Sequence, residues 1–477
     1  MPNVRREDLQ MKIPALLHLS RLGYGYLSGA QLKERERRTN FLPEALRDAV
    51  ERINGLSMTG EALAGLIREL QEQLDAEDLG KRFYETLRDG WNGLRLIDFA
   101  HAENNLFQSA SELACGRGAG SFRPDITLFV NGLPLAMIEV KTSDRLRGLQ
   151  AEYDRMMERF RGKEGRRYLQ CAQIWAFSDD HADDPGRLLP TEGAFFAAAM
   201  TEDFPVYAVR EKHPAIFRRL LPRNIGEEER ILADNGIPER PHTRDFQRSL
   251  SPKKATHRML TTLFHPARFL FLLRYGIRYV RETDPGGTEY LTRRMLTCAQ
   301  LSVLGTLCGK AKRGWRNWTV PSCGAAGEKA ANASLIAVLR DLAPGARLYW
   351  VSTDHTELQR EREELESCGI ACAEGRPAGE DRLILLTAEG NPKDLPAEER
   401  PFSGQRIFVL PPPVFCYGQR TAFSAGLRRA DPRAILVTRT TSRAPENSFS
   451  TILLRMEMKP GEKVPGKENR NGKQATG

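Results

Sequence analysis

The chain of 477 residues lacks any long hydrophobic run. Apolar stretches such as Phe269–Leu273 are far shorter than the roughly 20 residues that a transmembrane helix needs. The first ten residues, MPNVRREDLQ, carry too many charges for a secretory signal peptide. We therefore expect no membrane partner and a cytoplasmic location.

Cysteine is sparse and scattered, and only Cys368 and Cys372 lie close together. No histidine or second cysteine pair stands at zinc-ligand spacing from them. The pattern therefore excludes a zinc finger and a disulfide framework, and we interpret the thiols as the reduced cysteines of a cytosolic protein. The eight positions are Cys115, Cys171, Cys298, Cys308, Cys323, Cys368, Cys372 and Cys416.

Acidic charge is also in deficit, because 71 Lys and Arg outnumber 62 Asp and Glu and leave a net charge of +9. This balance favours a polyanionic partner, although a solvated surface rich in arginine would give the same number. The hydrophobic content of 40% is that of an ordinary globular protein, and the length suits two or three domains.

What is present is a hairpin pattern at Ser121–Lys141. Two apolar runs, Ile126–Val130 and Leu133–Val140, flank Asn131-Gly132. Both turn residues tolerate the positive φ of a tight turn, so the pattern predicts two antiparallel strands.

Three charged residues stand where the far ends of these strands would meet. Folding back at the turn places Asp125 roughly opposite Glu139, and Lys141 shares a face with Glu139 because it lies two residues further along the strand. Paired carboxylates suit Mg²⁺, which activates water and offsets charge on a phosphodiester. A bare pattern of this kind is usually solvated surface charge, but here the charges end two otherwise apolar strands.

The same residues carry a family resemblance. The segment Phe122–Lys141 (FRPDITLFVNGLPLAMIEVK), with Asn104–Gln108 (NNLFQ) before it, resembles the N-terminal nuclease domain of type I restriction enzyme R subunits. A looser resemblance continues through Ala176–Asp180, Glu192–Phe196 and Arg268–Val280. It implies a PD-(D/E)xK nuclease of a restriction-modification system, acting in antiviral defence.

The resemblance also implies roles for single residues. Asp125 and Glu139 would hold Mg²⁺, and Lys141 would orient the attacking water or stabilise developing charge. The family can supply a further acid from its N-terminal helix, where Gln10 stands here, and Glu7 is the nearest acidic candidate.

The family also has a glutamine four residues before a tyrosine on the helix after the lysine. Here Tyr153 is present, but the residue four before it is Leu149. Gln150 is one residue out of phase, which turns it about 100° around a helix. Gln150 and Tyr153 are therefore expected as supporting residues of an imperfect motif.

The expected first domain is an α/β fold, a PD-(D/E)xK restriction-endonuclease-like mixed sheet with flanking helices. Apolar spacing predicts helices over residues 9–22, ended by Gly23, and two helices within 44–74. We expect a polar linker at Arg223–Arg248 and an apolar helical segment over His257–Val280 whose arginines extend to solvent. The expected strands are Leu94–Phe99, Ala172–Phe177 and Gly193–Met200.

In the second half, Trp318–Lys329 (WTVPSCGAAGEK) is similar to a phosphate-binding loop through Gly324, Gly327 and Lys329. Glu328 brings a negative charge toward the place of the phosphates, and Ala330 replaces the hydroxyl that would hold Mg²⁺. ATP binding is therefore not expected.

This half still resembles the first RecA-like ATPase domain of the R subunit, in strands within 346–358, 407–418 and 433–441. Counting back from Tyr417-Gly418, the catalytic Asp and Glu of the family become Leu410 and Pro411, which cannot coordinate Mg²⁺. We expect a degenerate RecA-like parallel α/β domain. The second RecA-like domain has no counterpart in this sequence, so no DNA translocation is expected.

These inferences divide the chain into an endonuclease-like domain over 1–245, a degenerate RecA-like domain over 246–456 and a basic tail over 457–477. The predicted function is Mg²⁺-dependent cutting of double-stranded DNA, with modification and specificity subunits of a type I complex as possible partners. One alternative is an inactive relic that binds DNA or a partner subunit. Another is an ATP-dependent restriction subunit.

Overall fold

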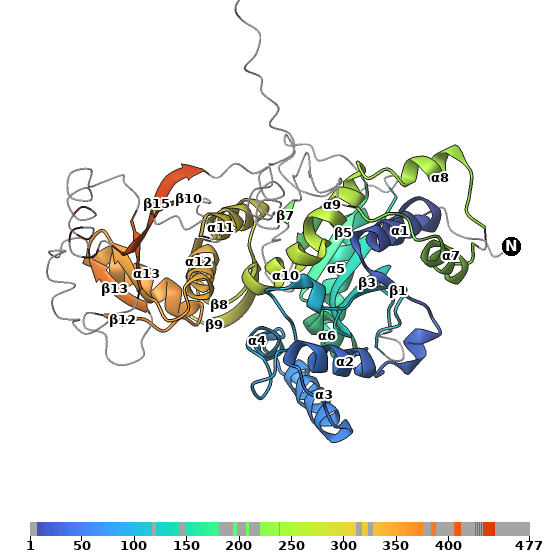
Figure 1. Ribbon diagram of the computed structural model, residues 1–477, viewed down its shortest axis with the longest axis horizontal. Coiled ribbons are helices and arrows are strands. Elements are labelled where there is room, and N and C mark those ends of the chain that lie inside the picture. The colour runs from blue at the N-terminus through green and yellow to red at the C-terminus, as the bar shows by residue number, and fades with distance from the viewer. Residues whose placement is uncertain are drawn as a thin grey trace, which may run out of the picture.

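The structure is a computed structural model with two main sheets, each associated with its own helices (Figure 1). The residues that it describes are 7–116, 121–142, 148–180, 194–197, 207–208, 220–237, 239–311, 317–322, 328–374, 383–387, 405–411 and 433–443, with Ala425, Leu427, Arg429 and Asp431.

A mixed sheet of seven strands in chain order forms the first part. The β1–β2 and β4–β5 pairs are parallel and the other neighbours are antiparallel. The predicted mixed α/β architecture is thus confirmed. The strands are β1 (Gly25–Leu27), β2 (Phe107–Ser111), β3 (Ile126–Val130), β4 (Leu133–Val140), β5 (Ile174–Ser178), β6 (Ala194–Ala197) and β7 (Tyr207–Ala208).

Helices surround this sheet in two groups. The first group contains α1, α7 and α9, which contact β1, β5 or β6. The second group contains α6, which contacts β4, together with α3 and α5, which pack beside α6. The helices are η1 (a π-helix, Asp8–Lys12), α1 (Ile13–Leu22), η2 (Gln31–Glu34), α2 (Pro43–Asn54), α3 (Gly60–Asp75), α4 (Lys81–Asp89), η3 (Ala102–Asn104), α5 (Gly148–Arg161), α6 (Lys163–Cys171), α7 (Ile225–Asp234), α8 (Arg244–Ser249), α9 (Ala255–Phe264) and α10 (Pro266–Tyr275). The predicted helices at 9–22 and 44–74 are confirmed, including the end of α1 at Gly23, whose φ is 103°.

The predicted hairpin forms, but its register depends on a β-bulge. The turn aligns Val130 with Leu133, and this register alone would set Asp125 against Ile138. The register shifts by one residue between Leu128 and Phe129. Ile126 therefore pairs with Ile138, and the next pair outward is Asp125 with Glu139. Because paired residues share a face, the bulge places both acids on the same side of the sheet.

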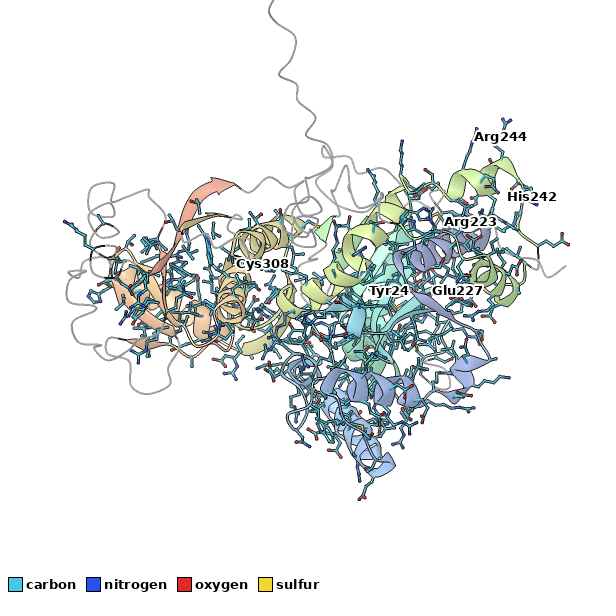
Figure 2. All side chains as sticks on the ribbon, viewed as in Figure 1. Tyr24, Arg223, Glu227, His242, Arg244 and Cys308 are labelled. Carbon is cyan, nitrogen blue, oxygen red and sulfur yellow. The ribbon has the colours of Figure 1, made fainter. Side chains whose placement is uncertain are left out.

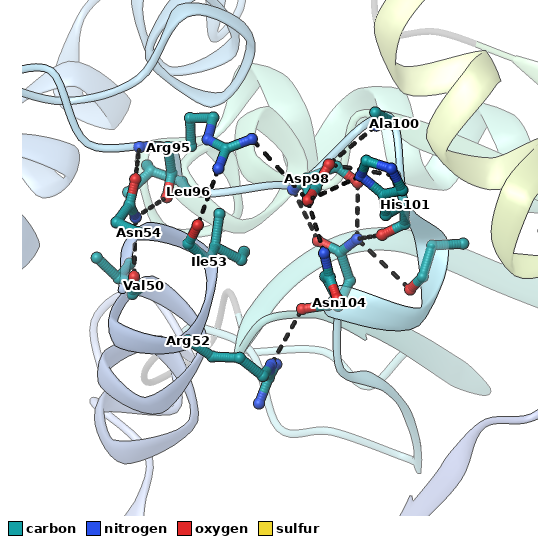
Figure 3. A network of polar contacts seen from close by, with 12 residues as sticks. Val50, Arg52, Ile53, Asn54, Arg95, Leu96, Asp98, Ala100, His101 and Asn104 are labelled. Atoms are coloured by element: carbon teal, nitrogen blue, oxygen red, sulfur yellow. Dashed lines mark hydrogen bonds and ion pairs between the residues drawn. The ribbon is translucent and has the colours of Figure 1, made fainter. Parts of the chain in front are cut away.

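The turn itself is buried and bound to the chain around it. Asn131 has φ 52° and no exposed surface. Its side chain accepts a hydrogen bond from Leu106 N at 2.8 Å and donates to Leu96 O at 2.9 Å and to Asn105 Oδ1 at 2.9 Å. Asn105 also accepts from the backbone N–H of Asp98, whose carboxylate accepts hydrogen bonds from Asn104 and from the backbone (Figure 3). This network fixes the turn end of the hairpin.

Gly132 fills a position that a larger residue cannot occupy. Its φ is 79°, and a Cβ there would lie 2.6 Å from Leu42 O and 2.9 Å from Leu46 N. Gly93 has the same φ of 79°, and a Cβ added to it would meet nothing within 4 Å, so it is a matched control. We expect Gly132→Ala to cost about 1 to 3 kcal/mol more unfolding free energy than Gly93→Ala, because only Gly132 adds a backbone clash. Urea denaturation measures both, and equal losses would contradict the packing argument.

A six-stranded, fully parallel sheet forms the second part, in the order β10-β15-β14-β11-β13-β12. Alternate residues of β11 pack into different apolar clusters, with Trp350 in one and Tyr349 in the other. Burial of both faces accounts for its continuous apolar runs. The elements are α11 (Cys298–Ala311), β10 (Asn317–Ser322), α12 (Glu328–Leu342), β11 (Arg347–Ser352), α13 (His355–Ser367), β12 (Ala373–Glu374), β13 (Leu383–Thr387), β14 (Arg406–Leu410) and β15 (Ile435–Arg443).

A hairpin of β8 (Ile277–Thr283) and β9 (Glu289–Met295) contacts helices of both parts. Arg293 on β9 is fully buried and donates to the carbonyls of Leu169, Gln170 and Ala172 at 3.3 to 3.4 Å. These carbonyls belong to the end of α6, where a cation is favourable. The arginine thereby binds the hairpin to the first part.

Three predictions from the sequence are wrong. The expected polar linker at Arg223–Arg248 instead contains α7, which packs against α1 and β1, and most of α8. Leu94–Phe99 is irregular rather than a strand, because the Leu96 carbonyl is bound by the Asn131 side chain. The segment His257–Val280 is not helical throughout, since α10 ends before Gly276 and Ile277–Val280 pairs with β9. Nor do its arginines all extend to solvent, because Arg268 and Arg278 are buried.

Two further observations concern the expected lack of membrane helices and the expected reduced cysteines. Among the described residues, no helix combines the length and apolar character needed to cross a bilayer. The six described cysteines are free thiols, whereas Cys323 and Cys416 lie outside the described residues.

Candidate active site

The structure brings the three predicted residues together. The Lys141 ammonium lies 3.5 Å from Asp125 Oδ2 and 3.7 Å from Glu139 Oε2. Two further acids complete the group, with Glu7 Oε1 at 3.2 Å and Glu152 Oε2 at 3.5 Å from the same nitrogen. One cation therefore stands among four carboxylates.

Each strand places its residue through backbone contacts. Lys141 follows the last residue of β4, and its backbone N–H donates to Ser178 O of β5 at 2.8 Å. Asp125 precedes β3, and its Oδ2 accepts the backbone N–H of Val140 at 2.9 Å. This bond ties the end of one strand to the acid of the other, and it requires the bulged register described above.

Glu7 comes from the N-terminal segment, one residue before η1. A π-helix is rare and usually occurs as a local distortion near a functional site. Here it precedes α1 directly and lets Glu7 reach Lys141, while Lys12 of the same turn bonds Glu112 at 2.5 Å. The acid expected at the N-terminal end is thus near the predicted residues.

Glu152 on α5 was missed by sequence reasoning. Its side chain is only 5% exposed, and it binds both Lys141 and Arg155. A signal did exist in the sequence. Glu152 lies on the same helical stripe as Tyr153, Met156 and Phe160, which are all buried, and an acid within an apolar stripe needs a partner.

The two predicted supporting residues have different outcomes. Tyr153 is buried and its ring meets Phe177 of β5 edge-on, with centroids 6.0 Å apart. Gln150 belongs to α5, but its side chain lies outside the described residues.

The cluster shifts the protonation of its members. Burial, with the neighbouring charges of Asp125 and Glu152, raises the pKa of Glu139 well above its usual value. Burial alone would lower the pKa of Lys141, but the surrounding carboxylates outweigh it and raise that pKa. Lys141 therefore remains an ammonium at any ordinary pH.

The raised pKa of Glu139 predicts a pH-dependent stability in metal-free buffer. The folded protein holds this proton more tightly than the unfolded chain, so stability falls as pH rises from about 4.5 toward the folded pKa. Glu139→Gln removes the titration. We expect the variant to gain at least about 1 kcal/mol over wild type at pH 8 and nothing at pH 4, because one pKa unit corresponds to about 1.4 kcal/mol. Thermal melts in EDTA test this, and a constant difference across pH would contradict it.

The donor set fits a hard cation such as Mg²⁺. All four acids offer oxygen, and Glu139 Oε1 is buried without a hydrogen-bond partner among the described residues. As the side chains stand, however, no three His, Cys, Asp or Glu residues within the described part of the chain are disposed around one ion position. The four carboxylates instead lie within 3.7 Å of the Lys141 ammonium.

The residues of the predicted phosphate-binding loop belong to the second part. Gly324 and Gly327 lie outside the described residues. Lys329 is exposed in the first turn of α12, and Ala330 is buried. Leu410 ends β14 and is buried in an apolar cluster, so it has packing rather than ligand contacts.

An internal ion pair crosses the carboxyl ends of the parallel strands. Arg439 of β15 pairs with Glu361 of α13, and it donates to Val351 O at 3.3 Å and Leu410 O at 3.4 Å. Glu361 accepts from the Trp350 indole at 2.9 Å. After β11 the chain continues to β12, which lies beyond β13 on one side of the sheet, whereas after β14 it continues to β15 on the other side. The boundary between β11 and β14 is therefore a switch point of the kind at which doubly wound sheets bind ligands. The pair fills that position.

Comparison with known proteins agrees with the first part. Residues 5–182 match the family model described as "Type I restriction enzyme R protein N terminus (HSDR_N)". The chain is 34% identical over 149 residues to the type I restriction enzyme HindI endonuclease subunit of Haemophilus influenzae, which is 26% of this chain and 14% of that protein. It is 33% identical over 159 residues to a candidate type I restriction enzyme MjaIXP endonuclease subunit of Methanocaldococcus jannaschii, which is 28% of this chain and 15% of that protein.

The matched stretch thus spans about one seventh of the length of these relatives. Within that stretch, the resemblance to the N-terminal region of type I restriction enzyme R proteins is confirmed.

Proposed function

We propose that this chain, whose residues 5–182 match the N-terminal region of type I restriction enzyme R proteins, is a Mg²⁺-dependent DNA endonuclease of the PD-(D/E)xK fold. The observation that carries the proposal is the convergence of Asp125, Glu139 and Lys141 at the ends of two neighbouring strands. Hard-oxygen ligands beside a fixed cation suit hydrolysis of a phosphodiester.

The carboxylates of Asp125 and Glu139 would hold the metal, with Glu7 and Glu152 as neighbouring acids. When bound, Mg²⁺ would lower the pKa of an attacking water and offset charge on the phosphate. The N–H of Val140 orients Asp125, and the buried setting of Glu139 leaves one of its oxygens without another partner.

Lys141 serves as a fixed charge in this proposal rather than as a general base. Its pKa is raised by the surrounding acids, so it has no free lone pair with which to accept a proton. The Lys141 side chain is 12% exposed, so its ammonium can instead donate hydrogen bonds to a phosphate oxygen and stabilise the charge that develops there.

We further propose that the parallel sheet is a RecA-like domain without ATPase chemistry. The cutting part would extend beyond residue 245, because α9 contacts β5 and β6 of the first sheet and α10 packs on α9. Double-stranded DNA is the proposed substrate, and modification and specificity subunits are the proposed partners, in the cytoplasm. The ion pair at the switch point and the apolar Leu410 support the loss of nucleotide chemistry.

A plasmid assay tests the proposal directly. Purified protein with supercoiled DNA is expected to produce nicked and linear forms in Mg²⁺, to produce none in EDTA, and to be unaffected by ATP. Absence of products in both Mg²⁺ and Mn²⁺ would reject the endonuclease.

A second candidate function, a non-cutting DNA- or partner-binding relic, is favoured by one observation. The ammonium of Lys141 stands where the carboxylates would need to hold a metal, and it neutralises part of their charge. Tight DNA binding in the plasmid assay without any nick would favour this candidate.

A further inference from the structure

A polar cavity lies beside the candidate active site. Its volume is about 280 Å³, and its lining comes from η1, the chain after β4 and β5, α8 and the start of α9. Thr142, which lines it, is the residue after Lys141, and Gln10 lies on the same π-helix that Glu7 precedes. The cavity and the acid cluster therefore share two structural elements.

Its position is one where α/β sheets bind ligands. The strands β4 and β5 are parallel, and Val140 pairs with Ser178 at their carboxyl ends. Thr142 and Asp179 follow these two ends and face the cavity. A ligand there would lie next to a phosphodiester held by the acid cluster.

The charges of the described lining disfavour a phosphate as the occupant. The described lining holds three carboxylates and two cations, and therefore carries a formal charge of −1. Lys254 pairs with Asp180, and Asp180 also accepts a hydrogen bond from the backbone N–H of Thr256, the second residue of α9. Asp180 thus already compensates the partial positive charge at the N-terminus of α9, and the described lining has no surplus of positive charge for a phosphate.

The same lining suits the edge of a nucleobase. A base presents donors and acceptors side by side, which amide, guanidinium and carboxylate groups read. Gln10, Arg248 and Asp179 offer these three groups around one cavity. Its volume is at the low end of ligand pockets, which suits one base rather than a longer segment.

We propose that this cavity takes one unstacked nucleobase adjacent to the scissile phosphodiester, with Gln10 and Arg248 as base-contacting residues. The proposal rests on the proposed endonuclease function. An unpaired base enters more readily than a paired one, because a paired base must first leave its stack. The chain would then cut preferentially next to mismatched or bulged bases.

The test compares two duplexes that differ in one group. One carries a single unpaired base, and the other carries a stable abasic analogue at the same position. Wild type, Gln10→Ala and Arg248→Ala are measured on both, with Arg244→Ala as control. Arg244 lies on the same helix as Arg248, does not line the cavity, and points away from the body of the molecule (Figure 2).

We expect Gln10→Ala and Arg248→Ala to cut the unpaired-base duplex about tenfold more slowly than wild type, the loss typical of a side chain that reads a base. On the abasic duplex both variants should match wild type, because the group that they contact is missing. Arg244→Ala should match wild type on both duplexes. A loss that persists on the abasic duplex would reassign the cavity to the DNA backbone, and no loss on either duplex would remove it from DNA recognition.

Binding of the same duplexes in Ca²⁺, followed by fluorescence anisotropy, separates this proposal from the nuclease assignment. The base-dependent difference between wild type and Arg248→Ala should appear in affinity even if wild type does not cut. Cutting by wild type without that difference overturns the cavity proposal alone. Failure of wild type both to bind and to cut overturns both proposals.

Discussion

Replacement of Lys141 by methionine is expected to lower Mg²⁺-dependent DNA cleavage by about 100- to 1,000-fold, the loss that follows removal of one pre-placed group that stabilises charge. Methionine keeps most of the side-chain volume, so the neighbouring packing should survive. The change removes only the ammonium that lies within 3.7 Å of four carboxylates. Conversion of supercoiled plasmid measures the rate.

The same variant should change how the fold responds to metal. Without the ammonium, four acids face one another uncompensated, so the metal-free variant should melt below wild type. Mg²⁺ should then raise the melting temperature of Lys141→Met by more than it raises that of wild type, because it would replace the missing charge. Lys253→Ala, at an exposed lysine, is the control and should change neither quantity. Wild-type cleavage by Lys141→Met would remove Lys141 from the mechanism.

The sequence predicted the convergence of Asp125, Glu139 and Lys141 because the hairpin signal is local. Asn131-Gly132 between two apolar runs is sufficient to bring the strand ends together. It was not sufficient for the register, because a two-residue turn alone would have placed Asp125 on the face opposite Glu139. The bulge corrects this, and Pro134 was its sequence signal, since proline within a strand is confined to edges, first positions and bulges.

Spacing along the sequence does not by itself bring the other two acids to Lys141. Glu7 precedes η1, whereas Glu152 lies on α5. Glu7 and Lys141 are 134 residues apart in the sequence. Only tertiary packing brings them to Lys141. The wrong helix prediction at Ile277–Val280 also reflects tertiary structure. Its short apolar run fits the spacing of a helix as well as that of a strand, and pairing with β9 makes it a strand.

The second large effect is expected at the buried ion pair of the parallel sheet. Arg439 and Glu361 have side chains 12% and 3% exposed, and Arg439 also covers the Trp350 ring at 4.4 Å. Arg439→Met should cost about 3 to 5 kcal/mol of unfolding free energy, because it leaves a carboxylate buried without its cation. Chemical denaturation measures the loss.

A second substitution should reverse much of that loss. Adding Glu361→Gln to Arg439→Met removes the unpaired buried charge. The glutamine keeps an oxygen that can accept the hydrogen bonds of the Trp350 indole and of Ser352, which donates to Glu361 at 2.5 Å. The double variant is therefore expected to regain at least half of the lost stability. Arg360→Met, which breaks surface pairs with Glu357 and Glu364 on the same helix, should cost less than about 1 kcal/mol.

The energetics of this pair bear on nucleotide binding. A ligand at the switch point would have to displace Arg439 from Val351 and Leu410, and would leave Glu361 unpaired. The cost of that displacement opposes any gain from phosphate contacts, so addition of ATP at a constant Mg²⁺ concentration should leave the melting temperature of wild type unchanged. Because a ligand that binds the native state stabilises it in proportion to the logarithm of its concentration, a melting temperature that climbs with ATP would show that the position is open. The chain would then be a candidate ATP-dependent restriction subunit.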